Sequence, residues 1–117
     1  MINRTLCIGL SLLALSGCAS DPAPVEQLRL ADQALTQAKA VGAHEQIAEL
    51  KLAEDKLAQA QAAMSDEEFK QARLLAEQAE LDARLAEARV LSEKSQAQLL
   101  DLNNRIDRLR KQLGELQ

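Results

Sequence analysis

The stretch SDEEFKQARLLAEQAELDARLAEARV, residues 65–90, decides the fold of this chain. Within it, one set of apolar residues recurs at alternating steps of three and four, the spacing that places side chains on one face of an α-helix. Most of them are alanines, so a second helix axis can come close to this face. The set is Phe69, Ala72, Ala76, Ala79, Ala83, Ala86 and Val90. We predict that this face packs on the preceding helix.

The four residues Ser65-Asp66-Glu67-Glu68 match a capping box at the start of this helix. In such a box the Ser65 oxygen accepts a hydrogen bond from the Glu68 amide, and the Glu68 side chain reaches back to the Ser65 amide. Acidic residues also suit the positive end of a helix dipole. The motif therefore predicts a tight αα-hairpin between residues 64 and 66.

The helix that follows has neither glycine nor proline from residue 66 to residue 113. At 1.5 Å per residue it should be roughly 70 Å long, far longer than the segments before it. A second apolar face of this helix is available to the first helix of the chain. That face consists of Leu74, Leu81, Leu85 and Ala88.

Two shorter helices are expected before residue 65. The first covers residues 25–40 and ends near Gly42, a residue suited to the left-handed position after a helix. The second begins at about residue 45. Their apolar faces are Leu28, Ala31, Leu35 and Ala38 in the first, and Ile47, Leu50, Ala53, Leu57, Ala60 and Met64 in the second. With the long helix they form a hairpin domain over residues 25–92.

Residues 93–117 carry a heptad pattern and are predicted to form a coiled-coil extension. Its interaction stripe is Leu99, Leu102, Ile106, Leu109, Leu113 and Leu116. No segment remains to cover it, so this half either bends back on the bundle or pairs with a second copy or another protein. A basic cluster beside it is interpreted as the polar flank of the coiled coil rather than a site for an anionic polymer. The cluster is Arg105, Arg108, Arg110 and Lys111.

The other end of the chain carries Leu15-Ser16-Gly17-Cys18, which resembles the lipobox of bacterial lipoproteins. Arg4 precedes a short apolar run that is too short to span a bilayer but is typical of a secretory signal. Residues 1–17 are therefore interpreted as a lipoprotein signal peptide. The alternatives are an ordinary secretory signal cleaved after Ala19, or an N-terminal core helix.

The lipobox resemblance implies that the Cys18 thiol receives a diacylglycerol and that its new amino group is acylated, with palmitate-type chains. Two or more chains anchor a protein stably in a lipid bilayer. Residues 18–24 then form a lipidated cysteine and linker, whose last six residues span at most about 20 Å. Sorting rules place such a protein in the inner leaflet of the outer membrane, facing the periplasm. Ser20 and Asp21 leave the inner membrane as an alternative.

Composition limits the remaining functions. The net charge is −4 at pH 7 and Phe69 is the single aromatic residue, which argues against nucleic-acid binding. After loss of Cys7 with the signal peptide, only the modified Cys18 remains, so no disulfide is expected. His44 is the single histidine and is expected at a turn, because a metal site or a catalytic triad needs several converging groups. We predict no enzyme activity, no metal and no cofactor.

Residues 25–90 resemble tetratricopeptide-type helical hairpins, through the small-residue spacing around Ala62-Ala63-Met64-Ser65-Asp66-Glu67-Glu68-Phe69. With the lipobox and the Val41-Gly42-Ala43 turn, the chain is similar to the envelope lipoproteins of domain-of-unknown-function family 4398. That resemblance implies association with OmpA-like peptidoglycan-binding proteins. The chain also resembles short murein lipoproteins, but it ends in Gln117 instead of their wall-linked lysine.

These observations predict an all-α protein, a three-helix TPR-like hairpin unit whose long third helix extends as a C-terminal coiled coil. The predicted function is a membrane-anchored, non-enzymatic scaffold for protein–protein interaction in the cell envelope. The alternative is a self-associating coiled-coil spacer between membrane and cell wall.

Overall fold

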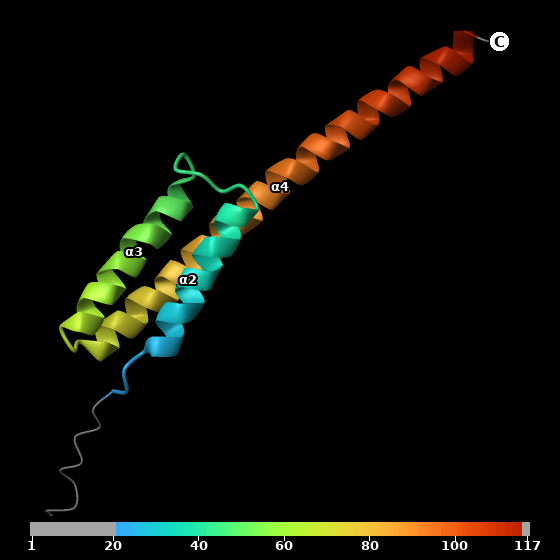
Figure 1. The fold of residues 1–117 in the computed structure, drawn as a ribbon. Helices are drawn as coiled ribbons and strands as arrows, with labels where there is room; N and C mark the ends of the chain where they lie inside the picture. Colours follow the sequence, from blue (N-terminus) through green and yellow to red (C-terminus); the bar gives the residue numbers. More distant parts are fainter. Residues whose placement is uncertain (1–20, 116–117) are drawn as a thin grey trace, which may run out of the picture.

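The computed structural model describes residues 21–115. All regular secondary structure in these residues is helical: α2 spans Val25–Ala40, α3 spans Ala48–Ser65 and α4 spans Phe69–Glu115. α2 and α3 lie along the first half of α4, and the second half of α4 projects beyond them (Figure 1). The predicted all-α fold with a long third helix is confirmed. The predicted signal peptide, Cys18 and Leu116 lie outside the described residues.

α2 has the predicted bounds. It begins directly after Pro24, whose ring presets the backbone for a helix and blocks an earlier start. At its end Gly42 has φ +102°, and the amides of Gly42 and Ala43 donate to the carbonyls of Lys39 and Ala38, both at 2.9 Å. This is a Schellman motif, which satisfies carbonyls that the helix end leaves free. The predicted role of Gly42 is confirmed.

α3 begins at Ala48, three residues later than predicted. The Ile47 amide donates to the His44 carbonyl at 2.8 Å, so a turn takes the place of the first helical residues. The apolar face is as predicted apart from its end, where Ala63 is buried and Met64 is half-buried.

The predicted capping box at Ser65 is wrong. Ser65 is the last residue of α3, and its hydroxyl donates to the Gln61 carbonyl at 3.0 Å. The Glu68 amide donates instead to the Ala63 carbonyl at 2.9 Å, because Glu67 adopts a left-handed φ of +62°. A second Schellman motif therefore uses the amide that the box required. The hairpin turn lies at residues 66–68 instead of 64–66.

The core lies where α2 and α3 meet one face of α4. Five alanines on that face have no exposed surface, and we call them the alanine seam: Ala72, Ala76, Ala79, Ala83 and Ala86. Buried residues of both shorter helices, among them Leu35 and Leu50, pack in one cluster with Ala79, Ala83 and Ala86. The predicted packing of this face on α3 is thus correct but incomplete, since α2 shares it.

The prediction that α2 covers a second face of α4 is wrong. Leu74, Leu81 and Leu85 are 49–66% exposed, and Ala88 is exposed as well. The alanine seam offers a closer approach of helix axes than a row of leucines does, so both short helices straddle it.

Polar contacts border the alanine seam on both sides. Toward α3, Lys56 lies 2.6 Å from Asp82 and Arg89 lies 2.8 Å from Glu49. Toward α2, the Lys94 ammonium donates to the Val41 carbonyl at 2.5 Å. Burial ends near this last contact: Val90 is the last buried residue, and every described residue from 91 onward is exposed. Residues 91–115 do not bend back on the bundle (Figure 1).

Candidate functional site

The predicted interaction stripe lies on the projecting half of α4. Its five described members are 37–64% exposed. They are Leu99, Leu102, Ile106, Leu109 and Leu113, and the sixth, Leu116, lies outside the described residues. A helix with an uncovered row of large apolar side chains has a surface that is typical of a protein interaction site.

The same three-four series continues backward along α4 to the exposed leucines of the bundle half. The whole series, which we call the leucine stripe, is Leu74, Gln78, Leu81, Leu85, Ala88, Ser92, Ser95, Leu99, Leu102, Ile106, Leu109, Leu113 and Leu116. Its described members are exposed, apart from the half-buried Gln78. From the sequence, the two ends of this stripe are predicted as separate faces, because the small residues Ala88, Ser92 and Ser95 lie between the large ones. The three-four spacing continues through these small residues without a break, and that continuity was the signal that could have joined the two faces.

The leucine stripe and the alanine seam lie on nearly opposite faces of α4. Helical periodicity separates their centres by about 150° around the axis. A helix can therefore dock on the leucine stripe without displacing α2 or α3. The bundle half of α4 thus has one face that holds the fold together and one face that stays exposed.

Charged residues border the leucine stripe at the tip of α4. Arg105 lies 2.7 Å from Asp101, and Arg110 lies 3.9 Å from Asp107, each pair within the same helix. Exposed pairs of this kind contribute a few tenths of a kcal/mol. Arg105 and Arg110 of the basic cluster therefore lie beside the apolar row, as on the flank of a coiled coil, whereas Lys111 lies on the opposite face of the helix.

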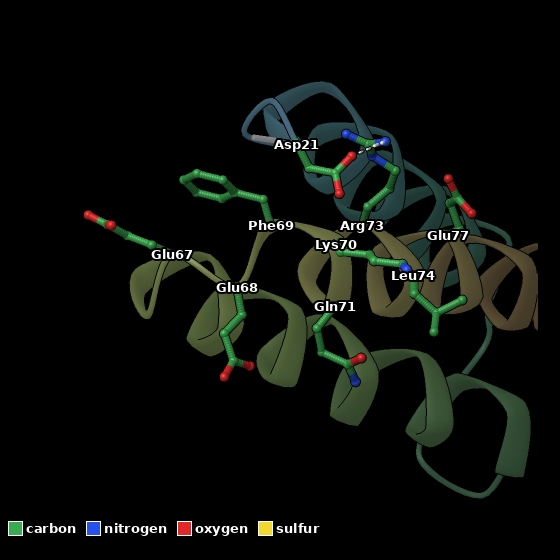
Figure 2. A pocket seen from close by; sticks show the side chains of 9 residues that line it. All are labelled: Asp21, Glu67, Glu68, Phe69, Lys70, Gln71, Arg73, Leu74 and Glu77. Atoms are coloured by element: carbon green, nitrogen blue, oxygen red, sulfur yellow. Dashed lines mark ion pairs between the residues drawn. The ribbon is translucent and has the colours of Figure 1, made fainter. Parts of the chain in front are cut away.

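An open hollow of about 880 Å³ lies at the base of the bundle, where the linker meets the start of α4 (Figure 2). Arg73 holds the linker there: one guanidinium nitrogen donates to the Pro22 carbonyl at 3.1 Å and another lies 3.7 Å from Asp21. Figure 2 shows Phe69 beside them. The hollow is lined mostly by exposed residues of both charges, so it lacks the enclosed apolar walls of a small-molecule pocket.

His44 occupies the turn before α3, as predicted. Its two ring nitrogens lie 3.2 Å from the Gly42 carbonyl oxygen and 3.2 Å from the Gln46 side-chain oxygen. These contacts tie the turn together. Within residues 21–115, no group of three or more His, Cys, Asp or Glu side chains is placed to hold a metal ion.

The ionisable groups have the electrostatics of an exposed surface. Its own backbone amide, and then Arg89, lower the pKa of Glu49, and a hydrogen bond from Arg29 lowers the pKa of Glu26. Both carboxylates are thus held ionised, whereas a general acid needs a raised pKa. The core of the described region contains no buried polar or charged residue. We find no catalytic arrangement in this part of the chain.

None of the helices within residues 21–115 is both long enough and hydrophobic enough to cross a lipid bilayer.

A family model described as a domain of unknown function, DUF4398, matches residues 26–102. The crystal structure of a DUF4398 family protein from Pseudomonas aeruginosa PAO1 is 66% identical, with a TM-score of 0.79; the match covers 82% of this chain and 100% of that chain. No curated protein matches.

Proposed function

The chain belongs to the DUF4398 family, as the sequence resemblance predicted, and from the residues of this member we propose a lipid-anchored, non-enzymatic protein that binds helices of envelope proteins. The observation that carries the proposal is the leucine stripe, which is exposed from Leu74 to Leu113 apart from the half-buried Gln78. Large apolar surfaces of this kind are rare on proteins that act alone.

Anchoring through Cys18 complements this surface. The lipobox supports acylation of Cys18, and the short linker keeps the bundle close to the bilayer. Arg73 supports the same arrangement, because its contacts with Asp21 and Pro22 hold the linker against the base of α4. The anchor would then concentrate the leucine stripe in the layer of periplasm beside the membrane, where binding needs less intrinsic affinity.

The partners expected for this surface are proteins that present an amphipathic helix. A helix of that type buries its apolar face against an apolar row, with anchors spaced by three and four residues. A second copy of this chain presents such a helix, and the family resemblance adds OmpA-like peptidoglycan-binding proteins as candidates. Ala19 and Ser20 favour the outer membrane, and separation of inner and outer membranes tests this placement.

The anchor is tested by metabolic labelling with a fatty-acid analogue. We expect label on the wild-type chain and none on Cys18→Ala. The matched control is Cys7→Ala, which should keep the label because Cys7 lies in the predicted signal peptide. Label retained on Cys18→Ala would refute the anchor.

The leucine stripe is tested by photo-crosslinking in cells, with a photoreactive amino acid placed at single positions of α4. We expect cross-links from Leu102 and Leu109, and none from Asn104 and Lys111, which lie on the opposite face of the same turns. Equal cross-linking from both faces, or none from the leucine stripe, would contradict a role of the stripe in binding.

A further inference from the structure

We propose that the helix bound by the leucine stripe is α4 of a second copy of this chain, in an antiparallel dimer centred on Ala97. The inference rests on the proposed helix-binding function and names the occupant of the stripe. Three features of the described residues carry it: the sizes of the stripe side chains, the charges that border them, and the free face of α4.

The side-chain sizes match in this register. Antiparallel pairing about Ala97 places Ser95 opposite Leu99, Ser92 opposite Leu102, and Ala88 opposite Ile106. Each small residue of one copy thus faces a large residue of the other. Large residues that face small ones allow the side chains of two helices to interdigitate. The interruption of the stripe by small residues becomes a complement to the large residues at the tip.

The register continues into the bundle half of α4. Leu85 then faces Leu109 and Leu81 faces Leu113 of the other copy. From Leu81 to Leu113 the overlap amounts to more than four heptads, a length of about 50 Å at 1.5 Å per residue. Sustained pairing over three to four heptads is already typical of a coiled coil.

The bordering charges oppose a parallel pair. In a parallel coiled coil, the residue just before the first core position of a heptad lies next to the partner residue five positions later in the sequence, which follows the second core position. In this chain the charged pairs of this kind are Glu77 with Asp82, Arg84 with Arg89, and Arg105 with Arg110. All three are like-charged, and each occurs twice in a symmetric dimer. A parallel coiled coil in register is therefore disfavoured along both halves of α4.

The same charges select among antiparallel registers. In an antiparallel pair, a flanking residue lies next to a flanking residue of the same heptad position in the partner. The register centred on Ala97 then places Asp82 next to Arg110 of the other copy. A shift of the partner by one heptad would place two arginines together in either direction, Arg84 with Arg105 or Arg89 with Arg110. Both shifted registers are therefore disfavoured by repulsion. Asp82 already binds Lys56 at 2.6 Å, so the new contact adds to an existing charge network and acts chiefly on register.

The fold leaves room for this pairing. The leucine stripe lies opposite the alanine seam, so α2 and α3 of each copy stay on the outer side of the dimer. The two linkers leave from opposite ends of the paired helices. If both lipid anchors enter one bilayer, the paired α4 helices lie along the membrane surface.

The first experiment measures the mass of the chain from residue 19 onward by sedimentation equilibrium. The crystallised relative, whose whole chain is matched by 82% of this one, shows that a chain of this extent folds. We expect a dimer, and a monomer for Leu102→Asp plus Leu109→Asp. The control Ala97→Asp plus Asn104→Asp adds the same two acids on the far face of α4 and should remain dimeric. A folded wild-type monomer at all concentrations would overturn the proposal.

The second experiment reads the orientation by disulfide formation with diamide as the oxidant, since this fragment has no cysteine of its own. Ser92→Cys plus Leu102→Cys should give a covalent dimer on a non-reducing gel. The control Ser92→Cys plus Leu109→Cys is offset by one heptad and should remain largely uncoupled. A covalent dimer of Ser95→Cys alone as the main product would indicate a parallel pair and overturn the inference.

The two proposals fail in different ways. Cross-links in cells from Leu102 to another protein, together with a monomeric fragment, would overturn the antiparallel dimer and leave the helix-binding function intact. Absence of any stripe-specific cross-link would overturn both. Cross-links at twice the mass of the chain, with the expected disulfide pattern, support both.

Discussion

The two faces of α4 reverse the usual relation between side-chain size and burial. The alanine seam is fully buried, whereas leucines on the opposite face of the same turns are about half exposed or more. A surface helix normally turns its large apolar residues to the core. Here the small residues hold the fold, because they let two helices approach closely, and the large residues remain exposed. Side-chain size alone therefore does not tell which face of a helix is the core.

The comparison is tested most strongly by removing a leucine from each environment. Leu50 of α3 is 2% exposed, so Leu50→Ala should lower the free energy of unfolding by about 3 kcal/mol through the cavity it leaves. Leu81→Ala, on the leucine stripe, should cost less than about 0.5 kcal/mol. Urea unfolding in the Leu102→Asp plus Leu109→Asp background removes any contribution of pairing. Similar losses for both variants would show that the stripe is part of the core.

Adding a leucine to each face is the next test. Ala83 has no exposed surface, and Ala83→Leu should force the helices apart at a cost of about 2 kcal/mol. Ala88→Leu makes the same change on the exposed face, where the two residues have similar helix propensity, and should be nearly neutral. Both are measured by urea unfolding in the same background. A neutral Ala83→Leu would mean that the seam is loosely packed.

The turns that bring α2 and α3 onto the alanine seam give a smaller effect. Gly42→Ala should destabilise the fold by about 1 kcal/mol, because the left-handed backbone conformation at this position is unfavourable for alanine. Its added Cβ would lie 3.5 Å from the Lys94 ammonium, an ordinary contact, so the cost is conformational. Glu67→Gly should have the opposite sign, a gain of up to about 1 kcal/mol, since Glu67 has φ +62°. Thermal unfolding midpoints test both, and loss of stability in Glu67→Gly would contradict the backbone argument.

The smallest expected effect concerns pH. The pKa of Glu49 is lowered from 4.5, first by its backbone amide and then by Arg89. A lowered folded-state pKa contributes stability that is present above the unfolded-state pKa and is lost as the pH falls through the folded-state value. The thermal unfolding midpoint should therefore decrease as the pH is lowered below about 4.5. In Glu49→Gln this decrease should be less steep. Glu26→Gln is the comparison, because Arg29 lowers the pKa of Glu26 through a contact within α2 alone. The contact of Glu49 with Arg89, in contrast, joins α3 to α4. An unchanged slope in Glu49→Gln would show that the lowered pKa of Glu49 does not contribute to the loss of stability at low pH.

Much of the fold could be predicted because its cues are local. The three-four spacing of apolar residues, the glycine after Ala40 and the absence of glycine and proline through α4 set three helices and their approximate lengths. The exposed tip of the interaction stripe was predictable too, since the two preceding helices are far shorter than α4. The hairpin turn was missed because Ser65 and Glu68 fit two motifs, and only the left-handed conformation of Glu67 decides between them.

The pairing of faces could not be predicted in the same way. Periodicity marked two apolar faces on α4 and left their partners open. The packed structure places α2 and α3 together on the alanine seam, because burial depends on how closely two helix axes can approach. The amino-acid order alone therefore establishes three helices, an uncovered tip and a lipobox-like start. Only tertiary packing decides that the leucines beside the bundle remain exposed and join the tip in one stripe, since that outcome depends on contacts between residues far apart in the chain.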